Sequence, residues 1–167
     1  MVYYKQLYSS PIGEMSLVAD NKGLVGIWFV KQKYAEKGVE EPVFLSSHAI
    51  LTQTKEALDA YFAGRNPHFE RIPLSMKATA FQERVWRYLT TIPYGQVVTY
   101  GEIGKVLGVR SAQAVGGAVG RNPYSILIPC HRVIGKNGQL TGYAAGLDKK
   151  DWLLAHELSM KKEDKTC

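Results

Sequence analysis

The alternation of apolar and polar residues at the start of the chain predicts a small antiparallel sheet. Two apolar runs, at residues 15–19 and 24–30, flank the polar tetrapeptide Asp-Asn-Lys-Gly at 20–23, and this arrangement is typical of a β-hairpin. A weaker alternation over residues 2–8 adds a further strand. The first part of the chain is therefore expected to hold a three-stranded sheet.

One helix is expected to accompany this sheet. Apolar residues recur at helical spacing over residues 48–63, and the pattern ends at Gly64. Residues 31–43 are mostly polar and are expected to form a loop. Residues 69–74 are a candidate edge strand, because Pro73 lacks the N–H group that an inner strand requires.

The second half of the chain carries the signals of several short helices. Thr-x-x-Gln at 79–82 and Thr-x-x-Glu at 99–102 are capping boxes, each of which marks the start of a helix. The second of these helices is expected to stop at Gly108, and Ser111 is expected to cap a further helix over 112–120. Two short helices joined by a turn of this length form a helix-turn-helix arrangement.

The helix expected at 112–120 has almost no large side chains. Glycine inside a helix costs roughly 1 kcal/mol relative to alanine, so several small residues together indicate that something approaches this helix closely. Two partners remain open, a neighbouring helix of the same protein or the backbone and groove of a nucleic acid. The small residues are Ala112, Ala114, Gly116, Gly117, Ala118 and Gly120.

A final helix is expected to begin at a capping Asp148 and to end near Leu158. On this helix Lys150, Leu154 and Glu157 share one face by the i, i+4, i+7 rule. Glu157 would lie close to the C-terminal end, where the helix dipole disfavours an anion. It is either an ordinary surface residue or a carboxylate with a specific partner.

The candidate reactive group lies in the pentapeptide Pro-Cys-His-Arg-Val at residues 129–133, which follows an apolar run at 126–128. Cysteine is nucleophilic only as the thiolate, so Cys130 beside a possible proton acceptor, His131, has the minimum equipment for covalent attack. The alternative is a buried cysteine that acts as a small hydrophobic residue. These five residues alone leave both interpretations open.

The charge of the chain is divided unevenly along its length. Residues 1–75 carry 8 Lys or Arg and 8 Asp or Glu, whereas residues 76–167 carry 13 and 7, a net charge of +6. All the excess positive charge therefore lies in the part that holds Cys130. A one-sided basic surface suits a polyanion, with nucleic acid first, although a solvated basic face is the plain alternative.

The composition is that of an ordinary globular protein, at 167 residues and 46% hydrophobic. Its two cysteines, Cys130 and Cys167, indicate no disulfide framework, and its four histidines show no metal-ligand spacing. We therefore expect no metal, no cofactor and a reducing, cytoplasmic location. The longest apolar stretch, at 24–30, is too short to span a bilayer, and the N-terminus lacks the pattern of a signal peptide.

Several ordered motifs within residues 76–158 closely resemble the O6-alkylguanine-DNA alkyltransferases, also called methylated-DNA–protein-cysteine methyltransferases. Residues 1–75 resemble this family only in general layout. The matching motifs are Ala114-Val-Gly-Gly-Ala-Val, Arg121-Asn-Pro, Ile126-Leu-Ile-Pro-Cys-His-Arg-Val-Ile, Gly142-Tyr143 and Lys150-Asp-Trp-Leu-Leu-Ala-His-Glu157.

The resemblance and the predicted elements together imply an α/β (α+β) fold in two domains. Residues 1–75 would form a ribonuclease H-like domain, a small three-stranded sheet with helices. Residues 76–167 would form a mostly helical, winged-helix-like DNA-binding domain that contains the helix-turn-helix and the active cysteine.

Members of this family flip an alkylated guanine out of the duplex and transfer its O6-alkyl group to the active cysteine. The resemblance assigns that role to Cys130 and implies single-turnover repair of O6-alkylguanine, and of O4-alkylthymine as well. His131 would deprotonate the thiol through a water, and Glu157 would hold the imidazole as the carboxylate does in a Ser-His-Asp triad. Because neighbours in a regular strand point to opposite faces, Cys130 and His131 need irregular backbone or that water.

The resemblance also assigns roles to residues around the cysteine. Tyr100 would reach N3 of the flipped guanine and ease departure of the guanine anion. Asn122 would tie the recognition helix to the active-site strand. As plain structural residues, the two would be a half-buried tyrosine and part of an Asn-Pro turn. The substrate pocket would be lined by Val133, Tyr143, Ala144, Ala145 and Lys150.

In this family the second helix of the helix-turn-helix enters the minor groove, which suits a helix with few large side chains. The arginine that usually fills the space of the flipped base is replaced here by Gln113, which offers volume and hydrogen bonds without charge. Binding is expected to depend on phosphates and groove shape. The DNA-binding residues would be Arg110, Ser111, Ala112, Gln113, Ala114, Gly117 and Arg121.

The expected partner is double-stranded DNA containing O6-alkylguanine, bound by a monomer. One other function is a damaged-DNA-binding module or regulator, against which Cys130, His131 and Glu157 argue. Another is a thiol hydrolase, which would need an oxyanion hole and would turn over repeatedly. Cys167 is expected to be an exposed thiol in the tail.

Overall fold

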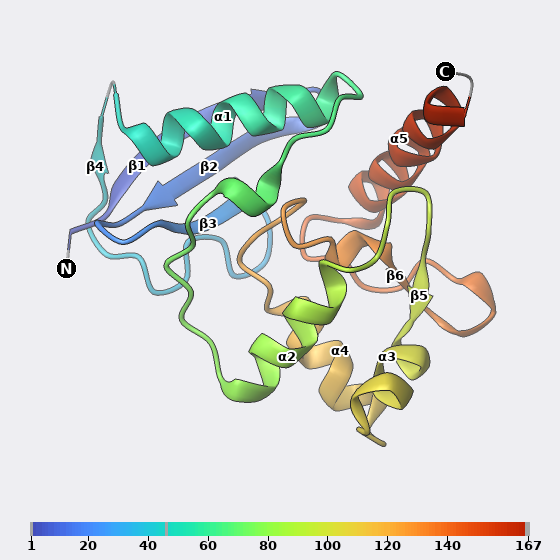
Figure 1. Ribbon diagram of the computed structural model, residues 1–167. Helices are drawn as coiled ribbons and strands as arrows, with labels where there is room; N and C mark the ends of the chain where they lie inside the picture. Colours follow the sequence, from blue (N-terminus) through green and yellow to red (C-terminus); the bar gives the residue numbers. More distant parts are fainter. Residues whose placement is uncertain (1, 46, 166–167) are drawn as a thin grey trace. The chain divides into compact units, whose positions relative to one another are not determined.

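The computed structural model describes residues 2–45 and 47–165, of which 161–165 by their backbone alone. The chain divides into two compact units, Met1–Lys77 and Ala78–Cys167. Each unit has its own small sheet and its own helices (Figure 1). The tail thiol predicted at Cys167 lies outside the described residues.

The first unit is built on a four-stranded sheet with the order β3-β2-β1-β4. Antiparallel pairing joins β1 to β2 and β2 to β3, and the short β4 runs parallel to β1. The predicted hairpin forms because the Asp20 carboxylate accepts hydrogen bonds from the backbone N–H groups of Lys22 (2.8 Å) and Gly23 (3.1 Å). The strands are β1 (Tyr4–Ser10), β2 (Gly13–Ala19), β3 (Leu24–Phe29) and β4 (Val43–Phe44).

Two parts of this unit differ from the expectation based on sequence. The sheet has four strands rather than three, because the predicted loop at 31–43 leads directly into β4. The edge strand predicted at 69–74 is wrong: Phe69–Arg71 form a 3-10 helix, and only Leu74 makes an isolated bridge, to Leu24. Backbone N–H groups of this segment bond within their own turn, so they do not extend a ladder.

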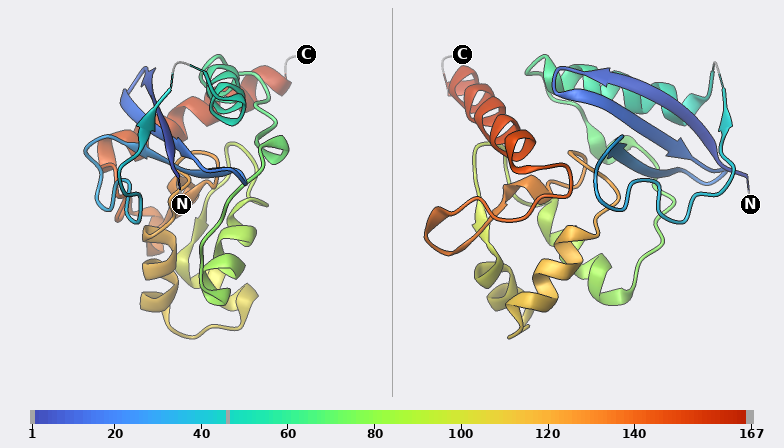
Figure 2. Two further views of the ribbon diagram at one scale, coloured as in Figure 1. Left: turned by 90° about the vertical axis from the view of Figure 1, so that its left-hand side faces the viewer. Right: turned by 180° about the vertical axis from the view of Figure 1, so that it is seen from behind.

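The sheet is covered on both of its faces. Leu17 and Val18 are neighbours in β2 and point to opposite faces, yet both are fully buried. The helix α1 (Ala49–Phe62) lies along one face (Figures 1 and 2) and buries Leu51 and Leu58. Burial on both sides explains why β2 and β3 are nearly continuous apolar runs.

The second unit is mostly helical, with a two-stranded parallel sheet. Both predicted capping boxes are present: Thr79 and Gln82, and likewise Thr99 and Glu102, exchange hydrogen bonds between side chain and backbone at the start of a helix. The helices are α2 (Ala80–Leu89), α3 (Tyr100–Leu107), α4 (Ala112–Gly120) and α5 (Leu147–Lys165), and the strands are β5 (Val98–Thr99) and β6 (Val133–Ile134).

Helices α3 and α4 form the predicted helix-turn-helix. Gly108 ends α3 at a φ of 71°, a conformation that favours glycine, and the Ser111 hydroxyl accepts a hydrogen bond from the Ala114 N–H to begin α4. Helix α4 is held from one side by α2, because the buried Trp86 indole donates a hydrogen bond to the Ala118 carbonyl at 2.8 Å. One use of the small residues is therefore close packing between helices.

The last helix is longer than its sequence pattern predicts. Helix α5 begins at Leu147, so Asp148 lies in its first turn and does not cap it, and the helix continues to Lys165 instead of ending near Leu158. Glu157 is therefore in the middle of α5, where the helix dipole does not disfavour an anion, contrary to the expectation from sequence. Of the helices described, α5 included, none is both long and apolar enough to cross a membrane.

We predict that alanine substitutions at two glycines one turn apart in α3 have opposite effects on stability. At Gly104 a Cβ atom would lie 2.6 Å from the backbone carbonyl oxygen of Val109, so Gly104→Ala should lower the free energy of unfolding by about 1–3 kcal/mol. At Gly101 a Cβ atom would lie 3.9 Å from the nearest atom, the Thr99 hydroxyl oxygen, so Gly101→Ala should raise the free energy of unfolding by up to about 1 kcal/mol. Urea unfolding measures both, and a Gly104→Ala protein as stable as the wild type would contradict the close packing.

Candidate active site and nucleic-acid interface

Asn122 connects the end of α4 to the segment that carries Cys130. Its side-chain Nδ2 donates hydrogen bonds to the carbonyl of Ile128 (2.7 Å) and to that of Tyr124 (3.3 Å), and its Oδ1 accepts one from the Tyr124 N–H (2.9 Å). The side chain is buried. The path of the backbone between α4 and Cys130 is therefore set by one amide group.

Two tight turns bring the backbone to Cys130. The Leu127 N–H donates to the Ser125 carbonyl (2.8 Å) around Ile126, which has a φ of 71°. The Cys130 N–H donates to the Ile128 carbonyl (2.8 Å) around the proline that precedes it. A β-branched residue at positive φ is strained by roughly 1–2 kcal/mol, so the fully enclosed Ile126 is held in place by its surroundings. This confirms the expected irregular backbone.

The irregular path continues through Cys130–Arg132, which form a single 3-10 turn. The turn directs His131 toward α5, where its Nε2 lies 2.5 Å from Oε2 of Glu157, with both side chains fully buried. The other carboxylate oxygen, Oε1, accepts a hydrogen bond from Nε of Arg132 at 2.6 Å. Two consecutive residues of one turn therefore bind the two oxygens of one carboxylate.

The charge state of Glu157 follows from these contacts. Burial raises the pKa of the carboxyl group, but the positive charge that His131 carries when protonated, the charge of Arg132 and the hydrogen bonds from both residues outweigh burial and hold the pKa at about 2, against an ordinary 4.5. An ionised carboxylate only accepts hydrogen bonds, so Nε2 of His131 carries the proton between them. The remaining ring nitrogen, Nδ1, is buried and has no hydrogen-bond partner among the described residues. It is the nitrogen that can accept a proton.

The Cys130 thiol is half-buried, and its surroundings have opposing effects on its pKa. Burial raises the pKa of the thiol, whereas a hydrogen bond with Asn122 and the positive charge of Lys150 lower it. Lys150 is fully buried and donates hydrogen bonds to the carbonyls of Thr141 (2.7 Å) and Gly142 (3.3 Å). Burial lowers its own pKa to about 8, so its positive charge is present at neutral pH and fades above pH 8.

Two tyrosines adjoin the thiol. The Tyr100 hydroxyl donates a hydrogen bond to the Thr141 carbonyl at 3.4 Å, and its pKa is raised by burial and by the charge of the nearby Cys130 thiolate. Burial, and then the charges of Cys130 and Glu157, raise the pKa of Tyr143 well above its ordinary value. Both hydroxyl groups are therefore protonated at neutral pH.

The other predicted pocket residues lie directly after the 3-10 turn of Cys130 and in the turn that precedes α5. Val133 follows the 3-10 turn in β6, pairs with Val98 and is buried. Ala144 and Ala145 are half-buried in the turn between Tyr143 and the start of α5. Among the described residues, no group of three or more His, Cys, Asp or Glu side chains is arranged to hold a metal ion.

Arg132 is part of this site, although its role was missed by the reasoning from sequence. It is 6% exposed, and its Nη1 donates to the Ile92 carbonyl at 2.5 Å while its guanidinium lies 4.6 Å from the centre of the Tyr94 ring. The available signal was an arginine placed between His131 and Val133 in a segment that is otherwise apolar. A charge in such a position requires a buried partner.

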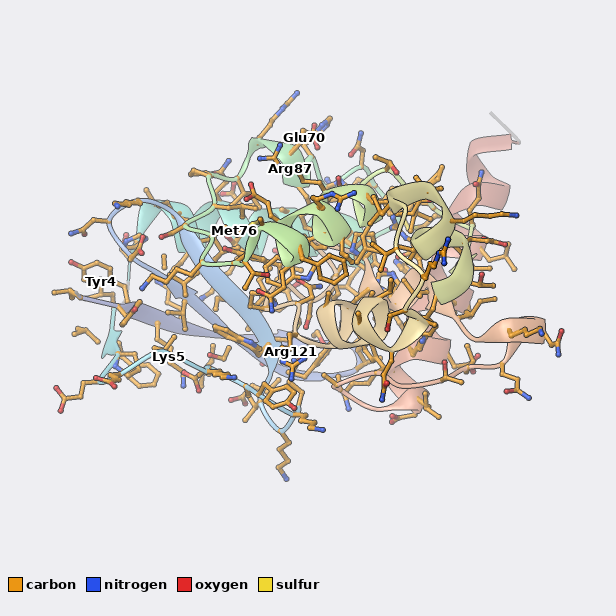
Figure 3. The ribbon with its side chains drawn as sticks, turned by 90° about the horizontal axis from the view of Figure 1, so that it is seen from below. Tyr4, Lys5, Glu70, Met76, Arg87 and Arg121 are labelled. Carbon is orange, nitrogen blue, oxygen red and sulfur yellow. The ribbon has the colours of Figure 1, made fainter. Side chains whose placement is uncertain are left out.

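The predicted DNA-binding residues gather on and around α4. Gln113, Gly117 and Arg121 succeed one another at intervals of four residues, so they share a face of the helix. The Arg121 guanidinium lies back along this face and donates from Nη1 to the Gly117 carbonyl at 3.3 Å; Figure 3 shows the residue at the end of α4. Arg110, Ser111, Ala112, Gln113, Ala114 and Arg121 are exposed, and Gly117 is half-buried.

Comparisons with known proteins cover both units. Residues 3–76 match the family described as the ribonuclease-like domain of 6-O-methylguanine DNA methyltransferase, and residues 80–159 match its DNA-binding domain. Two relatives are each called methylated-DNA–protein-cysteine methyltransferase. That of Methanosarcina acetivorans is 44% identical over 92% of this chain and 97% of its own, and that of Haemophilus influenzae is 40% identical over 92% and 86%.

Solved structures agree in fold. Mycobacterium tuberculosis OGT in complex with DNA is 38% identical, with a TM-score of 0.79 over 96% of this chain and 94% of its own. The O6-methylguanine-DNA methyltransferase of Pyrococcus kodakaraensis strain KOD1 is 27% identical, with a TM-score of 0.68 over 93% of this chain and 99% of its own. The α/β fold with a ribonuclease-like first part and a helical DNA-binding second part is therefore confirmed.

We predict that acid removes part of the stability through Glu157. Folding lowers the carboxyl pKa from 4.5 to about 2, so ionisation contributes about 3 kcal/mol of stability, which is complete above pH 4.5 and is lost as the pH falls toward 2. Glu157→Gln should therefore flatten the dependence of the unfolding free energy on pH over this range, as measured by denaturant titrations. Glu83→Gln is the control, because Glu83 is an exposed partner of Arg87 and its loss should leave the curve parallel to that of the wild type.

Proposed function

The chain belongs to the 6-O-methylguanine DNA methyltransferase family, and on this premise we propose that it repairs DNA by transferring the alkyl group of O6-alkylguanine to its own Cys130. The observation that carries the proposal is the arrangement of a half-buried thiol next to the buried pair of His131 and Glu157. This pair supplies a base on the residue that follows the thiol. A cysteine that served only as packing would not require one.

In the proposed reaction the thiol first loses its proton to Nδ1 of His131 through a water molecule. The imidazolium that forms is stabilised by Glu157, which stays ionised throughout. The Cys130 thiolate then attacks the alkyl carbon, a sulfur–carbon bond forms, and the bond between that carbon and O6 breaks. The electron pair of the broken bond stays on guanine, which leaves as an anion.

Tyr100 is proposed to receive that anion. Burial keeps its hydroxyl protonated, so it can donate a hydrogen bond, or its proton, to N3 of the departing guanine. Lys150 is proposed to favour the thiolate by its charge and to hold the 141–142 backbone at the edge of the pocket. The half-buried Ala144 and Ala145 leave room for a flat base, beside the backbone of Val133.

The reaction is proposed to occur once per molecule. The product is a thioether, whose sulfur–carbon bond water does not hydrolyse under mild conditions. This distinguishes the protein from a thiol hydrolase, whose intermediate would be released by water. It also distinguishes the protein from a damaged-DNA-binding module, which has no use for Cys130 or for the base beside it.

The proposed substrate is double-stranded DNA containing O6-alkylguanine, or O4-alkylthymine, with the exposed face of α4 in the minor groove. Gln113 would fill the space that the flipped base leaves, and Arg110 and Arg121 would contact phosphates at either end of the helix. We propose a monomer, because a single copy carries every residue of the site. We propose that it acts in the cytoplasm, because a reducing compartment keeps a reactive thiol free. The proposed domain boundary lies between residues 75 and 76.

We predict that Cys130 is the sole acceptor of the alkyl group. Incubation with a duplex containing O6-methylguanine should add one methyl group, which peptide mass spectrometry should place on Cys130 and not on Cys167, because Cys130 is followed by His131, a base held by Glu157. Cys130→Ala should accept none, whereas Cys167→Ala should react as the wild type does. Methyl transfer that persists in Cys130→Ala would overturn the proposed function.

We predict that Gln113 supports base flipping and not the chemical step. A flipped base leaves a gap whose closure competes with extrusion by a few kcal/mol, and Gln113 is the exposed side chain available to fill it. Gln113→Ala should therefore slow transfer from duplex DNA while barely changing the reaction with free O6-benzylguanine, and Gln113→Arg should match or exceed the wild-type rate on duplex. Single-turnover rates with both substrates measure this. Equal losses on both would assign Gln113 to the pocket or the fold.

A further inference from the structure

We propose that Arg132 is a positioning residue for the transfer reaction: it orients the Glu157 carboxylate so that His131 presents Nδ1, and not Nε2, as its basic nitrogen. The inference rests on the proposed transfer to Cys130 and adds a residue to its machinery. Among the described residues, Arg132 contacts Glu157, the Ile92 carbonyl and the Tyr94 ring, and not the thiol, so it would act through Glu157.

The guanidinium of Arg132 is fixed by three separate contacts. Nε donates to Oε1 of Glu157 at 2.6 Å, and Nη1 donates to the Ile92 carbonyl at 2.5 Å. The flat face of the group lies 4.6 Å from the centre of the Tyr94 ring. Glu157 on α5 and two residues that follow α2, Ile92 and Tyr94, therefore determine the plane of the guanidinium.

A fixed guanidinium in turn fixes the carboxylate. With Oε1 held by Arg132, the Glu157 side chain has one oxygen left for His131, and Oε2 lies 2.5 Å from Nε2. The carboxylate is an acceptor only while it is ionised, and burial alone would favour its neutral form. His131 opposes that tendency most strongly, and the hydrogen bond and positive charge of Arg132 add to its effect. The Tyr143 hydroxyl also interacts with Glu157, and it carries no positive charge.

The identity of the basic nitrogen matters because only one of the two can serve the thiol. Nε2 is occupied by Glu157, and Nδ1 is buried without a protein partner among the described residues. If the carboxylate turned away or became neutral, Nε2 would no longer be required to hold the proton. The tautomer with hydrogen on Nδ1 would then be populated, and that tautomer cannot accept a proton from Cys130.

A purely structural role for Arg132 makes a different prediction. The ion pair joins the 3-10 turn to α5, and removing one partner of a buried pair lowers stability because the other charge is left uncompensated. If it only joined two elements, its removal would lower stability but leave the tautomer of His131 unchanged in any molecule that folds. The two roles therefore differ in a spectroscopic property and not only in activity.

The test combines nitrogen NMR of 15N-histidine-labelled protein with single-turnover rates on free O6-benzylguanine, which requires no DNA binding. The variants are Arg132→Gln, Arg132→Lys, Glu157→Gln and the double variant with both glutamines, and His131→Gln assigns the His131 signals. The matched control is Arg84→Gln, because Arg84 also donates to a backbone carbonyl, that of Leu107 at 2.8 Å, but on an exposed surface.

We expect wild-type His131 to carry its proton on Nε2. Arg132→Gln should mix the two tautomers and lower the rate by about 10- to 100-fold, Arg132→Lys should restore part of both, and Arg84→Gln should change neither. In the Glu157→Gln background, loss of Arg132 should cause no further change. A folded Arg132→Gln protein with the wild-type tautomer, or losses that multiply in the double variant, would overturn the proposal.

If Arg132→Gln does not fold, the comparison of Glu157→Gln with the double variant decides the matter. Equal rates and equal His131 spectra support action through Glu157, and a further loss overturns it. A wild-type protein that fails to transfer a methyl group from duplex DNA containing O6-methylguanine would instead refute the proposed function. The His131 spectra would still report whether Arg132 sets the tautomer.

Discussion

One buried anion determines the arrangement of the second unit around Cys130. The Glu157 carboxylate lies in the middle of α5 with no exposure to solvent, and an unpaired charge in such a place would cost several kcal/mol. It is tolerated because His131 and Arg132 each bind one of its oxygens. Residues in succession can do this only from a tight turn, and that same turn begins with Cys130. The position of the thiol is therefore a consequence of how a carboxylate is accommodated inside the protein.

A second constraint comes from the short distance along the chain between α4 and the thiol. Asn122 directly follows the helix and binds the Ile128 carbonyl, while Ile126 is held at positive φ between them. A segment tied in this way has little freedom to move apart from the helix. The side chains that would contact DNA and the sulfur atom that would react with it thus belong to one rigid stretch of backbone. This rigidity limits how far the thiol can move relative to a docked base.

The features that the sequence predicted well are those with local causes. Capping boxes at Thr79 and Thr99, the turn after β2 and the end of α3 at Gly108 all depend on residues within four positions of one another. The elements that the sequence predicted wrongly depend on distant residues or lack a local pattern. Strand β4 forms only because β1 is beside it, and no apolar periodicity marks the end of α5. The buried role of Arg132 depends on a partner 25 positions away. Roles at the site came from the family resemblance, since spacing alone left Cys130 and Glu157 each with two interpretations.

Helix α4 has few large side chains, and its stability therefore depends on the rest of the unit. Its nine residues include three glycines and no residue larger than glutamine, and a helix this short is marginal in water even when its residues favour helix formation. It persists because Val115, Ala118 and Val119 are buried and the Trp86 indole holds its backbone. The helix therefore depends on the interior for its stability. A peptide of the same sequence would be a flexible coil, and the surface that we propose meets DNA exists only while the core beneath it is folded.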